Sequence, residues 1–269
     1  MARRAHLLLS RALATSSSQL VSSPACSPSF RGALVFDLEL TSPPLDESFE
    51  PSGPYPQLVG CLMYLMTCTC PYLTFPPSIL ARFVALGRHR SAHWLAAKKV
   101  AKYMGSTSGI GLVLGGHQTV ALTGHSDSSY ADDTQTLRST QGYCFSLGTG
   151  AVSWKSTRAS SVSSSSCEAE VYAAAMATQK LRWLSFLLTD LGEQPRSPPV
   201  VFADNRSAIL LCEEPRLVGK AKHIHLRYFL LRNVQQRGQA RMVQVASEAN
   251  TADIFTKVLP PCDHHRFCT

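Results

Sequence analysis

The chain has 269 residues, of which 45% are hydrophobic and 16% are charged, and its net charge is +8 at neutral pH. A chain of this length and composition buries a sizeable core in one or two domains, which excludes a wholly disordered protein. No apolar run reaches the roughly 18 residues that span a bilayer, so no membrane partner is expected. The basic balance favours a polyanionic partner such as nucleic acid.

Residues 1–50 differ in composition from the rest of the chain. The first 36 residues contain four arginines, many serines and no acidic residue. This composition is typical of an organelle transit peptide, and a disordered leader without a targeting role is the alternative. Prolines between positions 43 and 56 then indicate a linker. The nine cysteines are scattered and odd in number, which is typical of reduced thiols and predicts an intracellular protein of the cytoplasm or nucleus.

Residues 51–115 are predicted to be mainly helical. Apolar residues recur at helical spacing in three segments, 57–69, 78–87 and 91–105, which are separated by prolines and glycines. After these helices the spacing of the apolar residues becomes typical of strands, and a first short strand is expected over 109–116.

The remainder of the chain alternates between strands and helices. Strands are predicted over 118–127, 141–148, 150–157, 200–205 and 239–247, and the second and third form a hairpin around Gly-Thr-Gly. Helices are predicted over 164–191, 205–214 and 223–238, and a last helix begins at Thr251 as N-cap. A hairpin followed by strand–helix–strand units predicts an α/β fold with a mixed five-stranded sheet and helices on both faces.

Four acidic residues lie at the ends of these elements. Asp127 ends the first strand of the sheet and Asp204 ends a later, parallel strand, while Glu170 and Asp253 lie near the starts of two helices. The carboxyl edge of such a sheet is where ligands bind, and clustered carboxylates repel unless divalent cations neutralise them. Oxygen ligands suit Mg²⁺ or Mn²⁺, although acids at element ends are also commonly caps or surface residues. Glu168 is about 200° from Glu170 around the helix and is predicted to face elsewhere.

The chain resembles the ribonuclease H domain of copia-type retrotransposon polyproteins. The resemblance is carried, in order, by HSDSSYADD, LRSTQGYCFSLGTGAVSWKS, SSSSCEAEVYAA, FADNRSAILL, KAKHIHLRYFLLR and NTADIFTK. Upstream, YPQLVGCLMYLMT, LARFVALGRHRSAHWLAAKKVAKYM and GIGLVL resemble the tail and connection of the same polyprotein's reverse transcriptase. After the leader and linker over 1–50, which composition indicates, the resemblance implies a connection remnant over 51–115 and a ribonuclease H-like domain over 116–260, and a tail over 261–269 remains.

The same resemblance implies hydrolysis of the RNA strand of an RNA–DNA hybrid, with two Mg²⁺ or Mn²⁺ ions and no small-molecule substrate. By motif, the metal-binding and catalytic acids are Asp127, Glu170, Asp204 and Asp253. Basic and polar candidates for holding the hybrid are Asn205, Lys155, Arg158, Lys220, Lys222 and His223. For Lys220 and Lys222 a solvated loop is an equal alternative. An inactive remnant that at most binds nucleic acid is the alternative for the whole chain.

Two further patterns imitate known motifs. Residues 130–133 read YADD, like the metal motif of reverse transcriptases, but polar residues follow where an apolar hairpin strand is needed. The residues before the connection are also too few for a polymerase palm, so no reverse transcriptase activity is expected. The C-terminal CDHHRFC contains zinc-ligand residue types, but its spacing matches no structural zinc site.

Overall fold

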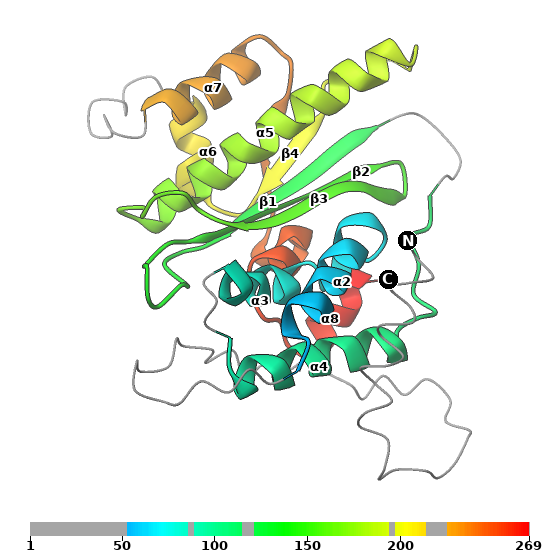
Figure 1. The fold of residues 1–269 in the computed structure, drawn as a ribbon. Helices are drawn as coiled ribbons and strands as arrows, with labels where there is room; N and C mark the ends of the chain where they lie inside the picture. The colour runs from blue at the N-terminus through cyan, green and yellow to red at the C-terminus, as the bar shows by residue number, and fades with distance from the viewer. Residues whose placement is uncertain (1–52, 86–88, 115–120, 194–196, 214–224, 269) are drawn as a thin grey trace. The chain divides into compact units, whose positions relative to one another are not determined.

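The computed structural model describes residues 53–85, 89–114, 121–193, 197–213 and 225–268 (Figure 1). The described chain forms two compact units: unit 1 contains the residues up to Gly111 together with those from Val258 onward, and unit 2 spans Leu112–Lys257. The predicted leader lies outside the described residues. In the described part of the chain, no helix is long and apolar enough to cross a membrane.

Unit 1 is helical. It contains α2 (Tyr55–Cys68), the short 3₁₀ helix η1 (Pro71–Leu73), α3 (Phe75–Ala85), α4 (Ser91–Ser106) and α8 (Pro261–Cys268). Its core is formed by the apolar faces that the sequence pattern predicted, and the fully buried Tyr55 donates its hydroxyl to the backbone oxygen of Leu80 at 2.8 Å. A buried tyrosine hydroxyl needs a hydrogen-bond partner, and here the bond joins α2 to α3.

The C-terminal helix α8 packs against the other helical segments of unit 1. Its His264 ring lies edge-on to Tyr103 of α4, with centroids 5.8 Å apart, and its Nε2 is 3.2 Å from the backbone oxygen of Tyr72 in η1. Pro261 occupies the first position of the helix, where a backbone N–H would have no partner within the helix, so its absence costs no hydrogen bond. The segment that sequence analysis assigned to a tail is thus an ordered helix, and the chain leaves unit 1 and returns to it.

Unit 2 is built on the mixed five-stranded sheet that the sequence predicted. The strands are β1 (Leu122–Ser129), β2 (Thr140–Leu147), β3 (Gly150–Arg158), β4 (Val200–Ala203) and β5 (Arg241–Gln244), in the order β3-β2-β1-β4-β5. β1, β2 and β3 pair antiparallel, whereas β4 pairs parallel with both β1 and β5. The carboxyl ends of β1 and β4 therefore lie at the same edge of the sheet.

Helices of unequal length cover the two faces of this sheet. The long helix α5 (Ser166–Asp190) crosses β1 and β2, and α6 (Arg206–Glu213) and α7 (His225–Gln236) lie beside it (Figure 1). Alanines line the buried side of α5 and allow it to lie close to the sheet. The 3₁₀ segment η5 (Thr251–Phe255), which follows η4 (Ser247–Ala249), packs on β1 and β2. This segment contacts Gly142 on the face of the sheet to which Asp127 also belongs. Tyr143 and Phe145 lie on the opposite face, where they pack with α5.

Gly142 of β2 makes the close approach of η5 possible. A Cβ atom at this position would lie 2.7 Å from Phe255 Cβ and 2.8 Å from Thr256 Cγ2, which is shorter than real side-chain contacts. Gly142 is also the register partner of Asp127 on β1. The absence of a side chain on β2 therefore allows η5 to lie directly beside the carboxylate of Asp127.

Two predicted elements differ from the structure. The expected strand over 109–116 is absent from its described part: Val113 and Leu114 lie against Gly150 of β3, but they form no strand and are 75% and 64% exposed. The predicted last helix is the short 3₁₀ segment η5, and its N-cap is Asn250, whose side chain accepts a hydrogen bond from the Ala252 N–H, and not Thr251. Asn is the stronger N-cap residue of the two.

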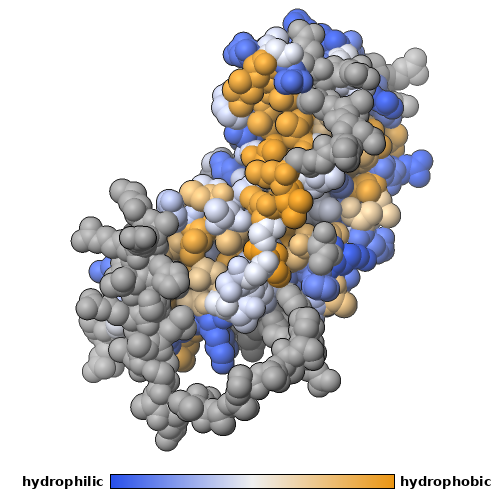
Figure 2. Space-filling view, turned by 90° about the vertical axis from the view of Figure 1, so that its right-hand side faces the viewer, coloured by the Kyte–Doolittle hydropathy of each residue, from blue (hydrophilic) through white to orange (hydrophobic). Residues whose placement is uncertain are grey.

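Apolar side chains are also exposed on the surface. Figure 2 shows such residues gathered on the side of the molecule that it presents. In unit 2 the C-terminal half of α5 and its C-cap residue expose several large apolar side chains, which are Trp183, Phe186, Leu187 and Leu191.

Candidate metal centre

Three of the four predicted acids come together at the carboxyl edge of the sheet. Asp127 lies near the end of β1, Asp204 directly follows β4, and Glu170 projects from the second turn of α5. One carboxylate oxygen from each of these residues lies within 4.8 Å of the others, which is the only such group of possible metal ligands in the described part of the chain. The parallel pairing of β1 with β4 creates this proximity.

The group is buried on one side and open on the other. Asp127 and Glu170 are 2% and 7% exposed, whereas Asp204 is half-buried. Burial, reinforced by the charges of Asp127 and Asp204, raises the pKa of Glu170 to about 9. Burial also raises the pKa of Asp127, although Lys257 and Thr256 counteract it. Without a bound cation, the ionisation of all three carboxyl groups in this buried setting is unfavourable in free energy.

The fourth acid, Asp253 in η5, lies beside this group and faces a lysine. Lys257 places its Nζ 3.0 Å from Asp253 Oδ1 and 3.7 Å from Asp127 Oδ2. The Thr256 hydroxyl also donates a hydrogen bond to Asp127 Oδ2. Burial and the charge of Asp127 raise the pKa of Asp253 to about 7 even with Lys257 so close. The pKa of Lys257 is raised too: burial acts against its charge, but the two carboxylates outweigh it.

Buried polar side chains hold the segments that carry these acids. Asn250 is fully buried, donates its Nδ2 to the backbone oxygen of Ser126 at 3.1 Å, and accepts from the Ala252 N–H at 3.2 Å. One amide thus ties the residue before Asp127 to the residue before Asp253. On the other side, the hydroxyl of Ser247 donates to Asp204 Oδ2 at 2.8 Å.

The arrangement fits a divalent cation. All the ligand atoms are carboxylate oxygens, which Mg²⁺ and Mn²⁺ prefer. Glu170 Oε2 is buried and has no hydrogen-bond partner among the described residues. A buried carboxylate oxygen without a partner carries a desolvation penalty, which a bound cation removes.

Glu168 belongs to a different network, as its place on the helix predicted. Its Oε2 accepts hydrogen bonds from the N–H and hydroxyl of Ser164, both at 2.6 Å, and its Oε1 accepts from the hydroxyl of Tyr172 at 2.6 Å. The Ser165 hydroxyl in turn accepts from the Glu168 N–H at 3.1 Å. Glu168 therefore caps the start of α5 and lies outside the acidic group.

The predicted hybrid-binding residues are only partly described. Lys155 is exposed on the edge strand β3. Arg158 donates to Asp133 Oδ2 at 2.6 Å while 30% of its side chain stays exposed, and Asn205 caps α6 by accepting from the Ala208 N–H at 3.0 Å. Lys220, Lys222 and His223 lie outside the described residues.

Sequence reasoning missed four residues around the acids. Lys257, Thr256 and Asn250 all lie in the quoted motif NTADIFTK, so their types and spacing were visible, but only Asp253 of that motif was proposed as a site residue. Ser247 had no signal in the sequence, because its bond to Asp204 joins two loops that are far apart in the chain. The residues of CDHHRFC do not form a group of metal ligands in the described part of the chain.

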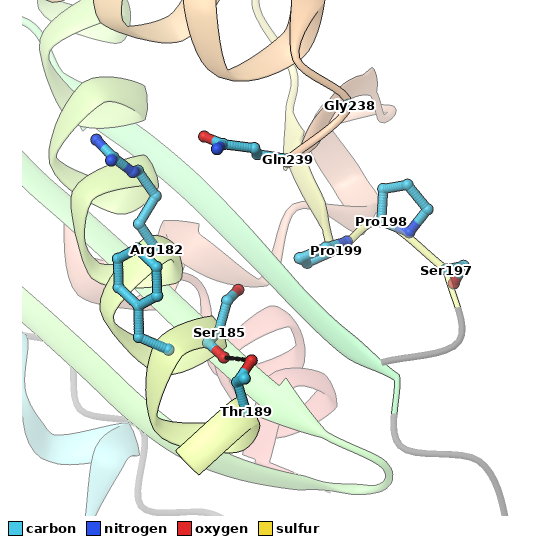
Figure 3. A pocket seen from close by; sticks show the side chains of 9 residues that line it. Arg182, Ser185, Thr189, Ser197, Pro198, Pro199, Gly238 and Gln239 are labelled. Atoms are coloured by element: carbon cyan, nitrogen blue, oxygen red, sulfur yellow. Dashed lines mark hydrogen bonds between the residues drawn. The ribbon is translucent and has the colours of Figure 1, made fainter. Parts of the chain in front are cut away.

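A cavity of about 420 Å³ lies elsewhere on unit 2. Figure 3 shows it between α5, the segment before β4 and the turn that leads into β5. It is lined by Arg182, Ser185, Phe186, Thr189, Ser197, Pro198, Pro199, Gly238 and Gln239. Pro199 precedes β4 and Asp204 follows it, so the cavity and the acidic group lie at opposite ends of this strand. The cavity is therefore separate from the candidate metal centre.

The sheet order and the acids at the ends of β1 and β4 define unit 2 as a ribonuclease H-like domain, as the sequence predicted. The chain is 37% identical over 205 residues to the retrovirus-related Pol polyprotein from transposon RE2 of Arabidopsis thaliana, and 34% identical over 207 residues to that from transposon TNT 1-94 of Nicotiana tabacum. These matches cover 76% and 77% of the chain. The chain belongs to the family of Pol polyproteins from copia-type transposons, which confirms the resemblance.

The chain spans only 14% and 15% of the lengths of these two relatives. No protein-family model matches it. A solved structure of LC11-RNase H1 in complex with RNA/DNA hybrid aligns with 50% of this chain. The alignment covers 93% of the LC11-RNase H1 chain, with a TM-score of 0.36 and 12% sequence identity. The identification of the family therefore rests on the sequence relatives, and that of the fold on the sheet of unit 2.

Proposed function

We propose that unit 2 hydrolyses the RNA strand of RNA–DNA hybrids, with divalent metal ions bound by Asp127, Glu170, Asp204 and Asp253. The observation that carries this proposal is the group formed by the first three acids, whose carboxylate oxygens lie within 4.8 Å of one another. Membership of the Pol polyprotein family supports the hybrid as substrate, because reverse transcription produces RNA–DNA hybrids. The ions are Mg²⁺ or Mn²⁺, two per site.

The protein's own contribution is to hold these carboxylates in place. The strands β1 and β4 fix Asp127 and Asp204, and α5 brings Glu170 against them from one face of the sheet. Bound there, divalent cations supply an activated water and stabilise the leaving oxygen of a phosphodiester. Because the pKa of Glu170 is raised to about 9, this carboxyl must release a proton when a cation binds.

Contacts to the hybrid are proposed for Lys155, Arg158 and Asn205, and for the predicted residues 220, 222 and 223. Binding through backbone phosphates is sensitive to salt and indifferent to base sequence. We propose no small-molecule substrate, and we place the activity in the cytoplasm or nucleus. Primer extension is not expected from this chain.

The test uses the full chain and a hybrid whose RNA strand carries a 5′ label. We expect RNA cleavage in Mg²⁺ or Mn²⁺ and none in EDTA. Asp204→Asn should abolish cleavage, since it removes one charged ligand from the group. The matched control is Asp190→Asn, the same change at the exposed end of α5, which should cleave as the unmutated chain does.

The competing proposal, an inactive remnant, makes a different prediction in the same assay. A folded, unmutated chain that shifts the hybrid in a gel but leaves the RNA intact in both metals would overturn the nuclease and favour the remnant. Cleavage that persists in Asp204→Asn would overturn the assignment of the acids.

A further inference from the structure

Lys257 occupies a position among the acids that the proposed function does not explain. Its Nζ lies between two of the proposed ligands, 3.0 Å from Asp253 Oδ1 and 3.7 Å from Asp127 Oδ2. The side chain is 40% exposed, so the ammonium group borders both the carboxylates and the solvent.

The four acids divide into two sets around this lysine. Asp127, Glu170 and Asp204 form the group within 4.8 Å, and Asp253 is not a member of it. Asp253 meets Asp127 through the lysine that both of them contact. The structure thus offers one set of carboxylates to a first divalent ion, and places a protein cation where Asp253 would help to hold a second.

We infer that the ammonium group of Lys257 is the resident cation of the second metal position, so that a second divalent ion binds only by displacing it. This inference rests on the proposed function, because it concerns the second ion of the same site. A lysine ammonium is a compact point charge on a flexible stem, which suits both occupation and release. The side chain of Lys257 is 40% exposed, whereas Asp253 and Asp127 are held by η5 and β1.

The inference gives Lys257 a measurable effect on metal binding. Competition from a tethered ammonium weakens the second ion more than the first, because Nζ lies closer to Asp253 Oδ1, at 3.0 Å, than to Asp127 Oδ2, at 3.7 Å. Replacement of Lys257 by Met keeps the length and apolar stem of the side chain and removes the charge. We therefore expect K257M to bind the second ion at least about tenfold more tightly, a difference of about 1.4 kcal/mol.

The experiment measures Mn²⁺ binding to the full chain without nucleic acid, by calorimetry and by electron paramagnetic resonance of the free ion. The unmutated chain should bind one ion tightly and a second weakly, and K257M should tighten the second more than the first. K257R, which keeps the charge, should behave as the unmutated chain. K180M is the matched control, because it removes a lysine from α5 ten residues beyond Glu170, about 15 Å along the helix.

Each outcome decides one of the two proposals. Identical binding curves for the unmutated chain, K257R and K257M would overturn the role of Lys257 and leave the metal centre intact. Loss of the first ion in K257M, with the fold verified by circular dichroism, would also overturn it, since Lys257 would then support the first site. A folded unmutated chain that binds no Mn²⁺ would overturn the proposed function itself.

Discussion

The substitution Gly142→Ala tests whether the close packing of η5 on β2 builds the metal centre. The added methyl group would point at Phe255 and Thr256, with its carbon 2.7 Å and 2.8 Å from their side-chain carbons. Both partners belong to the segment that carries Asp253 and Lys257. The substitution therefore acts on the site through packing alone, and leaves every proposed ligand in the sequence.

The size of the effect follows from these distances. Ordinary contacts begin at 3.4 Å, so η5 must move away from β2 by about 0.7 Å, or β2 must yield by the same amount. Overpacking of this kind costs about 1–3 kcal/mol of stability. A misplacement of about 1 Å at a catalytic site lowers the rate on the order of 10²-fold. We expect Gly142→Ala to lose both stability and hybrid cleavage.

Urea unfolding and hybrid cleavage of the full chain measure the two effects. Gly60→Ala is the control, because it adds the same methyl group to an exposed face of α2 with no atom within 4 Å. In a helix this change should stabilise the chain by roughly 0.5–1 kcal/mol. If Gly142→Ala is as stable and as active as the unmutated chain, η5 does not depend on close contact with β2 and the reasoning is wrong.

Three more substitutions probe the same unit. Asn250→Ala should lower the free energy of unfolding by about 2–4 kcal/mol in urea titrations, because it removes an N-cap and leaves the buried oxygen of Ser126 without its donor; a loss below about 0.5 kcal/mol would contradict this. The pKa of Glu170 is raised from 4.5 to about 9, so its contribution to stability is complete below pH 4.5 and is lost as the pH rises through 9. In EDTA, Glu170→Gln should therefore lose less stability between pH 5 and 9 than the unmutated chain, and an equal loss would refute the shift. Lys155→Gln should weaken hybrid binding for all base sequences and reduce the slope of log affinity against log salt by about 1, whereas an unchanged slope would exclude a phosphate contact.

The sequence predicted the acids at the carboxyl edge because their placement follows from strand order. Asp127 lies near the carboxyl end of β1 and Asp204 directly follows β4, and parallel strands bring such ends together. Glu170 and Glu168 were separable by the helical period alone, and the structure places them in different networks. Periodicity and chain order are local signals, and they were sufficient for this part of the site.

The surroundings of Asp253 could not be predicted in the same way. The contact of η5 with β2 depends on a missing side chain at Gly142, and a glycine within a strand pattern signals only a close approach, without naming the partner. The pairing of Lys257 with Asp127 joins residues that are distant in the chain. The same limit explains α8, whose packing depends on the contact of His264 with Tyr103 and not on a periodic pattern.

The return of the chain to unit 1 through α8 has a consequence for limited proteolysis. Unit 2 is inserted between two parts of unit 1, so the backbone crosses from one unit to the other twice, after Gly111 and after Lys257. A single cut at the first crossing produces two fragments, and the larger still carries α8. That helix remains bound to the smaller fragment through His264, Tyr103 and Tyr72. Release of the ribonuclease H-like unit in native conditions therefore requires cleavage at both crossings, and a chain cut once should still elute as one particle.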